Sequence, residues 1–196
     1  MANKVKYGLS HVYFAKATIA EDNTATYDKP VAWPGAVSMS LDAEGDTKTD
    51  RADNTDYFTS ISNSGYSGTF ECELIPDSFR QTILGDIVDS DGVVLEDANA
   101  KTQPFALLFQ FEGDASNTRY VFYNATAGRP SIEGETTGDT IEPKHDSIVF
   151  NAKAIYIKAL DKNVTKGYAD ESNSLYATWF DTVHVPTALK TEESKG

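Results

Sequence analysis

Hydrophobic and polar residues alternate along residues 66–75, and this alternation is the clearest structural signal in the chain. A period of two residues predicts a strand with one buried face and one polar face. The apolar face is expected to carry Tyr66, Phe70, Cys72 and Leu74. The opposite, polar face is expected to carry Ser67, Thr69, Glu71 and Glu73. Pro76 then ends the predicted strand.

A short amphipathic helix is predicted directly after this strand. Asp77 is a suitable N-cap, because its carboxylate can accept hydrogen bonds from the free N–H groups of the first turn. Apolar residues then recur at helical spacing, which predicts one buried stripe. The stripe consists of Phe79, Ile83, Leu84, Ile87 and Val88. The turn-forming sequence DSDG at 89–92 is expected to end the helix.

The remaining apolar segments indicate an antiparallel β-protein. They predict strands over residues 11–19, 36–41, 57–62, 93–95, 104–111, 119–125, 147–158 and 175–180. The segment 104–111 is apolar on both faces, so both faces are expected to be covered, and 119–125 is its expected hairpin partner. We therefore predict one mainly-β domain over residues 1–196, an antiparallel β-sandwich or barrel flanked by one α-helix.

A long polar stretch, residues 42–56 (DAEGDTKTDRADNTD), contains no apolar residue larger than alanine. Because it shows neither helical nor strand periodicity, we predict a long loop. Loops of this length are uncommon in compact domains and are usually functional or disordered. The polar tail, residues 186–196, is expected to be loose.

Composition and charge restrict the classes of function. The formal net charge of −13 argues against a protein that wraps nucleic acid, which requires a basic surface. It is compatible with a surface along which DNA passes without sticking, and equally with solubility alone. The N-terminal sequence lacks an apolar signal region, and no run approaches the length of a membrane span. We therefore expect synthesis in the cytoplasm and no membrane partner.

The residue types that carry catalysis do not form a recognisable constellation. Cys72, the only cysteine, is expected to be a buried small hydrophobic residue. The histidines lie in unrelated segments without metal-ligand spacing, at His11, His145 and His184. Glu71 and Glu73 point the same way, but catalytic carboxylates normally come from different elements and face a pocket. We predict no catalytic residue and no enzyme.

Two acidic segments resemble cation sites. In the DSDG turn, placing Gly92 at position 6 of a calcium loop puts Ile87 and Ala98 at positions 1 and 12, where oxygen ligands are required. That match fails. The acids of the polar stretch could hold a cation in a preformed loop, although a solvated loop is the stronger interpretation. They are Asp42, Glu44, Asp46, Asp50, Asp53 and Asp56. We predict neither a metal nor a cofactor.

A series of short motifs adds a family resemblance. In order, they are VYFA at 12–15, PGAVSMSL at 34–41, RADN at 51–54, GYSGT at 65–69, IPDSF at 75–79, ILG at 83–85, PFALLFQF at 104–111 and RYVFY at 119–123. Their order and spacing, over about residues 10–158, resemble the major tail proteins, or tail tube proteins, of long non-contractile-tailed bacteriophages of Gram-positive hosts. Where that family commonly has a tyrosine before the Ala-Asp-Asn, this chain has Arg51.

The resemblance implies a tail tube-like fold, a β-sandwich flanked by a helix, that assembles as stacked hexameric rings around a lumen through which DNA passes without specific binding. The polar stretch would then bridge to the next ring through Asp42, Glu44, Asp46, Asp50, Arg51, Asp53, Asn54 and Asp56. Ser67, Thr69, Glu71 and Glu73 would line the lumen, or alternatively face the outside of the tube. Implied partners are further copies of the chain and the tape measure, tail terminator and distal tail proteins of a virion tail.

A cation-dependent glycan-binding β-sandwich, such as an adhesin module, is the alternative function. It requires the acids of residues 42–56 to hold calcium beside an aromatic platform.

Overall fold

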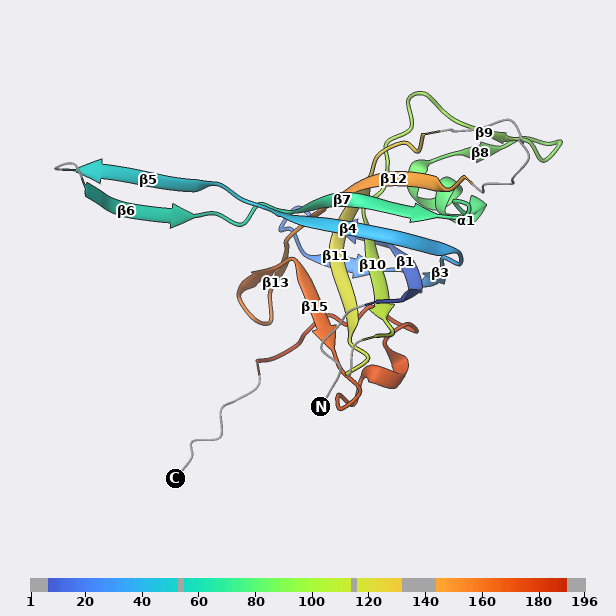
Figure 1. Ribbon diagram of the computed structural model, residues 1–196. Helices are drawn as coiled ribbons and strands as arrows, with labels where there is room; N and C mark the ends of the chain where they lie inside the picture. The colour runs from blue at the N-terminus through green and yellow to red at the C-terminus, as the bar shows by residue number, and fades with distance from the viewer. Residues whose placement is uncertain (1–6, 53–54, 114–115, 132–143, 190–196) are drawn as a thin grey trace, which may run out of the picture.

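The computed structural model describes residues 7–52, 55–113, 116–131 and 144–189, and its main feature is one large antiparallel sheet (Figure 1). The strand order is β2-β1-β10-β11-β12-β7-β4, with β3 added to β1 and β15 added to β11. These strands are β1 (Leu9–Ile19), β2 (Ala25–Tyr27), β3 (Val31–Ala32), β4 (Ala36–Glu44), β7 (Gly65–Cys72), β10 (Phe105–Phe111), β11 (Arg119–Ala127), β12 (Asp146–Lys153) and β15 (Lys166–Ala169). The predicted mainly-β fold, with one short helix, is confirmed.

Three small hairpins extend from this sheet. They are β5 (Thr47–Ala52) with β6 (Thr55–Ile61), β8 (Ile87–Val88) with β9 (Val94–Leu95), and β13 (Ile155–Ile157) with β14 (Lys162–Val164). The helical segments are α1 (Asp77–Phe79), the π-helical turn η1 (Arg80–Leu84) and the 3-10 turn η2 (Tyr176–Thr178).

The centre of the sheet is the β10–β11 hairpin, as the sequence predicts. Leu107 lies opposite Phe122, and Phe109 lies opposite Tyr120. Residues 105–110 of β10 are all buried, so the strand is covered on both faces. The continuous apolar run therefore identified the most buried strand of the chain.

Two hydrophobic clusters cover the two faces of this hairpin. The first cluster contains Phe105, Leu107 and Phe109 from β10, and the second contains Ala106 and Leu108. Large side chains of the first cluster are Phe14, Trp33, Phe70, Phe79, Phe122 and Phe150. The second cluster is completed by Tyr123, Ile155, Ile157 and Trp179.

A pair of tyrosines, the buried Tyr123 and the partly buried Tyr27, belongs to the second cluster region. The hydroxyl group of Tyr27 donates a hydrogen bond of 2.8 Å to the backbone oxygen of Tyr123. Burial raises the pKa of both phenols above their ordinary value, that of Tyr123 to about 12. Both side chains therefore remain neutral at physiological pH and act in packing.

The helix after β7 is shorter than the sequence predicts. Pro76, not Asp77, is the N-cap residue, and Asp77 is the first residue of α1. The helical segment ends at Gly85, which adopts a left-handed φ of 87°. Ile87 and Val88 therefore do not extend the buried stripe; they form β8 and are exposed. Phe79, Ile83 and Leu84 are buried as predicted.

Two further predictions about elements were wrong. Residues 175–180 do not form a strand: Asn173 and Leu175 start a 3-10 turn that places Trp179 in the second cluster. The strand predicted over 66–75 ends at Cys72, and Leu74 is 72% exposed. Ile75 is buried in its place, and its N–H donates to the Asp146 carboxylate at 3.0 Å.

The long polar stretch is not a loop. Its first residues belong to β4, and residues 47–52 and 55–56 belong to the β5–β6 hairpin, in which Thr49 lies opposite Thr59 and Asp50 lies opposite Phe58. Asp53 and Asn54 lie outside the described residues. The sequence predicts most of β6 as the strand 57–62, whereas β5 contains no apolar residue larger than alanine and so lacks the alternation by which strands are recognised.

Replacement of Ile83 by alanine is expected to lower the free energy of unfolding by about 2–5 kcal/mol, because Ile83 is 0% exposed and its truncation leaves a cavity. Ile87, which is 55% exposed, provides the matched control, and its replacement by alanine should change stability by less than about 1 kcal/mol. Equilibrium denaturation of both variants measures the difference. Equal midpoints for the two variants would contradict the packing of this segment.

Candidate assembly surfaces

A three-stranded polar surface, which we call the polar face, lies on the side of β4, β7 and β12 away from the first cluster. Residues that lie directly opposite one another in antiparallel strands project from the same side of a sheet. Three rows cross the strands in this way, with Glu71 between Ser38 and Ser147, Thr69 between Ser40 and Val149, and Ser67 between Asp42 and Asn151. Met39, Leu41, Phe70 and Phe150 point to the opposite side, into the first cluster.

The side chains of the polar face are linked across the strands. The Ser38 hydroxyl donates to the Glu71 carboxylate at 2.7 Å, and the Ser67 hydroxyl donates to Glu44. The polar face carries the carboxylates of Asp42, Glu44 and Glu71, and its basic side chain is Lys153 at the end of β12. Carboxylates therefore outnumber bases on this face. The polar face is thus acidic, with short hydroxyl side chains between the charges.

Glu73 lies beyond the end of β7. Its backbone N–H donates to the oxygen of Gly35 at 2.8 Å, and its carboxylate lies 3.6 Å from Nδ1 of His145. Ser67, Thr69 and Glu71 thus belong to the polar face, whereas Glu73 borders it. Whether any of them lines a lumen is a matter of assembly and stays a prediction.

The β5–β6 hairpin, which we call the arm, projects beyond the main sheet as a continuation of β4 and β7 (Figure 1). Backbone hydrogen bonds from Ser64 N to Glu44 O (2.8 Å) and from Ser62 N to Asp46 O (2.9 Å) continue the β4–β7 pairing into the arm. Phe58 of the arm is 62% exposed. An exposed aromatic side chain on a projecting element is typical of a contact surface.

The residues predicted to bridge between rings are distributed along β4 and the arm. Asp42 and Glu44 are on β4, and Asp46 lies at the junction. Asp50 and Arg51 belong to β5, and Asp56 belongs to β6. The described residues of this set therefore follow the extended backbone of β4 and of the arm.

Strand β4 is an edge of the sheet, since β7 is its only partner among the described strands. An edge strand of nine residues presents a row of free backbone N–H and C=O groups. Such an edge can pair with a strand of another chain.

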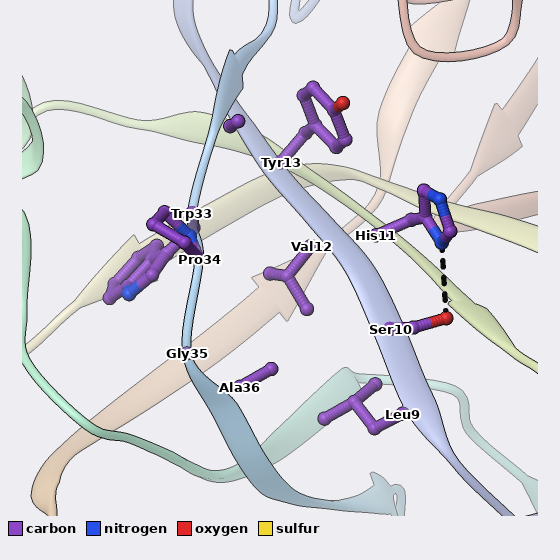
Figure 2. Close-up of a pocket in the computed structure, with 10 residues that line it drawn as sticks. Leu9, Ser10, His11, Val12, Tyr13, Trp33, Pro34, Gly35 and Ala36 are labelled. Atoms are coloured by element: carbon purple, nitrogen blue, oxygen red, sulfur yellow. Dashed lines mark hydrogen bonds between the residues drawn. The ribbon is translucent and has the colours of Figure 1, made fainter.

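An open pocket of about 340 Å³ lies between β1 and the segment from β3 to β4 (Figure 2). Figure 2 shows Val12, Trp33 and Ala36 around it, together with His11, whose Nδ1 is 3.1 Å from the Ser10 hydroxyl. The His11 ring stacks on Phe180 with 5.7 Å between ring centroids. The pocket is lined by apolar side chains and by the polar side chains of Ser10, His11 and Tyr13. Ser10 and His11 form a hydroxyl–imidazole contact between neighbours on one strand, and no carboxylate among the lining residues orients the imidazole.

Cys72 is buried, as predicted, and burial raises the pKa of its thiol, which keeps it protonated and unreactive. The buried indole Nε1–H of Trp33 has no oxygen or nitrogen acceptor. Its polar neighbour is the Cys72 sulfur, which accepts hydrogen bonds only weakly.

Within residues 7–52, 55–113, 116–131 and 144–189, no group of three or more His, Cys, Asp or Glu side chains is arranged to hold a metal ion. Over the same residues, no helix has both the length and the apolar character needed to cross a membrane. That the chain is not an enzyme and carries no cofactor stays a prediction.

Comparison with solved structures gives matches that include two chains of the anti-feeding prophage. No protein-family model matches the chain, and no curated protein matches it. A chain in the cryo-EM structure of the tube terminating cap of the anti-feeding prophage is 11% identical, with a TM-score of 0.45, over 85% of this chain and 93% of that chain. A chain in the cryo-EM structure of the anti-feeding prophage baseplate is 10% identical, with a TM-score of 0.47, over 85% of this chain and 95% of that chain. At such low scores the matches carry no argument about function, and the resemblance to phages of Gram-positive hosts stays a prediction.

Proposed function

We propose that this protein is the structural subunit of a phage tail tube and assembles into stacked rings around a channel for DNA. The polar face carries this proposal. It is three strands wide, backed by a hydrophobic cluster, and carries carboxylates and hydroxyl groups together with Asn151, the exposed Val149 and the basic Lys153. Such a surface suits a wall past which DNA must move without binding.

Electrostatics explain why that surface would function in a channel. Proteins hold DNA mainly through lysine and arginine contacts with phosphates, and each such contact retards movement. Carboxylates such as Asp42 and Glu71 repel phosphates at short range, and the net charge of −13 extends this repulsion over the whole subunit. The duplex would therefore stay mobile inside the tube.

Two further features supply contacts for assembly. The free edge of β4 can continue the sheet into the neighbouring subunit of a ring, which removes an exposed edge. The arm projects in the direction of β4 and β7 and can reach the next ring. Together these features give one contact within a ring and one between rings.

Negative-stain electron microscopy of the concentrated, purified protein tests the proposal. Rings or tubes of uniform diameter are the expected result. Monomers at all concentrations, together with a melting temperature that rises with added calcium, would overturn the proposal and favour the glycan-binding module.

Reversal of charge on the polar face should hinder DNA passage. Replacing Glu71 and Glu73 with lysine is expected to leave folding and assembly intact, because both positions lie outside the hydrophobic clusters. Phosphate contacts by the new lysines should slow ejection, and this slowing should diminish at higher salt. The measurement is the ejection rate of phage particles that carry the variant tubes.

The matched control for this prediction reverses two exposed acids far from the polar face. Glu21 lies in the turn between β1 and β2, and Glu112 follows β10. Lysine at these two positions changes the net charge equally and should leave the ejection rate unchanged. Normal ejection by the Glu71→Lys, Glu73→Lys tubes would remove these residues from the lumen.

A further inference from the structure

The outer edge of β4 is open along residues 38–44. At the start of the strand, Leu9 of β1 and Ala36 line the same pocket (Figure 2), and a bulge at Val37 interrupts the ladder with β7. Beyond the bulge, β4 pairs with β7 in unbroken register over residues 38–44. Among the described strands, β7 is the only partner of β4. This stretch therefore presents free backbone N–H and C=O groups on its outer side.

The open stretch lacks the usual protection against the addition of a strand. Edge strands commonly carry proline, lysine or a bulge that discourages pairing. Residues 38–44 (SMSLDAE) contain neither proline nor lysine, and the bulge lies outside them. The apolar side of the stretch is also incompletely covered, because Met39 and Leu41 are half-buried and Ala43 is exposed. A further strand would complete this side of the sheet.

Two polar side chains in the middle of the stretch lack hydrogen-bond partners. Elsewhere on the polar face, hydroxyl and carboxylate groups bond to each other, as the Ser38 hydroxyl does with Glu71. Among the described residues, the Ser40 hydroxyl and the Asp42 carboxylate form no such bond. A strand that is added to β4 therefore meets an available donor and an available acceptor, two positions apart on the same side of the sheet.

The sequence of the open stretch is complementary to itself in antiparallel pairing. We consider two copies of β4 that are related by a two-fold axis through Leu41. The opposing pairs are Ser38 with Glu44, Met39 with Ala43, Ser40 with Asp42, and Leu41 with its own copy. On the polar side, each carboxylate then lies opposite a hydroxyl group, and the unpartnered side chains of Ser40 and Asp42 meet twice. On the other side, apolar residues meet apolar residues.

The other antiparallel registers are less favourable. An axis through Asp42 would place the two Asp42 carboxylates opposite each other, and like charges in such positions destabilise a sheet. An axis through Ser40 would leave Glu44 without an opposing residue, because the bulge at Val37 interrupts the other strand at that point. An axis between two residues would oppose outward-pointing backbone groups to groups that point toward β7. The axis through Leu41 is therefore favoured.

We propose that two copies of the chain join through β4 in this register and form a symmetric dimer with one continuous sheet. The contact is isologous, so it closes after two copies and does not propagate. The inference goes beyond the proposed function and does not require a tube. Within the proposed function, the dimer occupies the edge that a ring would use, so it is an unassembled state that has to open before a ring forms.

Cysteine pairing tests the dimer and its register together. Ser40→Cys and Asp42→Cys proteins are prepared separately, mixed under reducing conditions and then oxidised; both positions are exposed, and the buried Cys72 does not compete. Directly opposing residues have Cβ atoms about 4.5–5.5 Å apart, whereas a residue and its own copy would be diagonal neighbours about 7–8 Å apart, too far for a disulfide. The mixture should give a disulfide-linked dimer, and neither protein alone should do so.

The matched control for cysteine pairing is a mixture of Ser40→Cys and Asn151→Cys proteins. Asn151 is exposed on the polar face but lies on β12, away from the open edge. This mixture should give no disulfide-linked dimer.

Charge at position 40 should change the dissociation constant of the dimer in opposite directions. Ser40→Lys places an ammonium group opposite Asp42 of the other copy, twice in each dimer, and should lower the constant about tenfold. Ser40→Asp opposes carboxylates there and should raise the constant about tenfold. Sedimentation velocity measures the constants. Asn151→Lys and Asn151→Asp make the same charge changes away from the edge, where salt screens them, and should change the constant less than about threefold.

Failure of this inference and failure of the proposed function are distinguishable. The β4 contact is overturned if the Ser40→Cys and Asp42→Cys mixture gives no linked dimer, or if either protein links to itself, whether or not tubes form. Equal shifts from the position 40 and position 151 charge variants would also overturn it. A linked dimer in the mixture, with no rings or tubes after reduction, would support the β4 contact and overturn the tail tube.

Discussion

Replacement of Phe79 by alanine is expected to lower the free energy of unfolding by about 3–5 kcal/mol. Phe79 is fully buried, and its ring centroid lies 4.2 Å from that of Trp33, 5.0 Å from that of Phe14 and 5.3 Å from that of Phe105. Truncation removes these ring contacts and leaves a cavity where α1 meets the sheet. Because domains are typically stable by only about 5–15 kcal/mol, the variant should be close to unfolding.

Tryptophan fluorescence, to which Trp33 next to Phe79 and Trp179 of the second cluster both contribute, provides the measurement during denaturation by urea. The matched control is Phe58→Ala, which deletes the same side chain from an exposed position on the arm. Its free energy of unfolding should change by less than about 1 kcal/mol. If the two variants unfold at the same urea concentration, the aromatic cluster does not anchor this segment as described.

The sequence predicts the centre of the fold well because burial there is complete. Residues 104–111 are apolar at nearly every position. The pattern therefore indicates a strand that is covered on both faces, and not one with a polar, exposed face. The partner 119–125 follows after a short polar break, which leaves an antiparallel hairpin as the simplest connection. Local sequence and long-range packing agree at this point.

The sequence misleads where two patterns coincide. Ile87 and Val88 continue the spacing of Phe79 and Ile83, so they match a helical stripe. Gly85 is the residue that decides the outcome: a Cβ there would lie 2.9 Å from the Cβ of Ala100, and its left-handed φ ends the helical turn. Glycine as a helix-ending signal was present in the sequence and outweighed the apolar spacing.

The polar face shows what sequence can and cannot predict about the candidate site. Alternation along β7 correctly separates Ser67, Thr69 and Glu71 from the core residues. The neighbours of these residues, such as Ser38 and Ser147, come from strands far away in the sequence. Register between distant strands is set by tertiary packing, so the width and acidity of the face appear only in the structure.

Removal of the arm is expected to abolish the growth of tubes while the subunit still folds. The variant replaces residues 47–61 with Asn-Gly, a sequence suited to a tight turn. Because Ser62 N donates to Asp46 O at 2.9 Å, the two ends already lie side by side and can be joined without moving β4 or β7. Strands β5 and β6 pair only with each other, so the main sheet loses no partner strand.

The reason for the expected loss of tubes is that the arm projects from the subunit and has no supporting role within it. Sedimentation and electron microscopy of the variant should show folded monomers or single rings, with a melting temperature near that of the wild type. The Phe58→Ala variant, with an intact arm, serves as the comparison. Reduced but measurable tube growth in that variant would place part of the contact on the Phe58 ring. Tubes of normal length from the armless variant would contradict the role of the arm in joining rings.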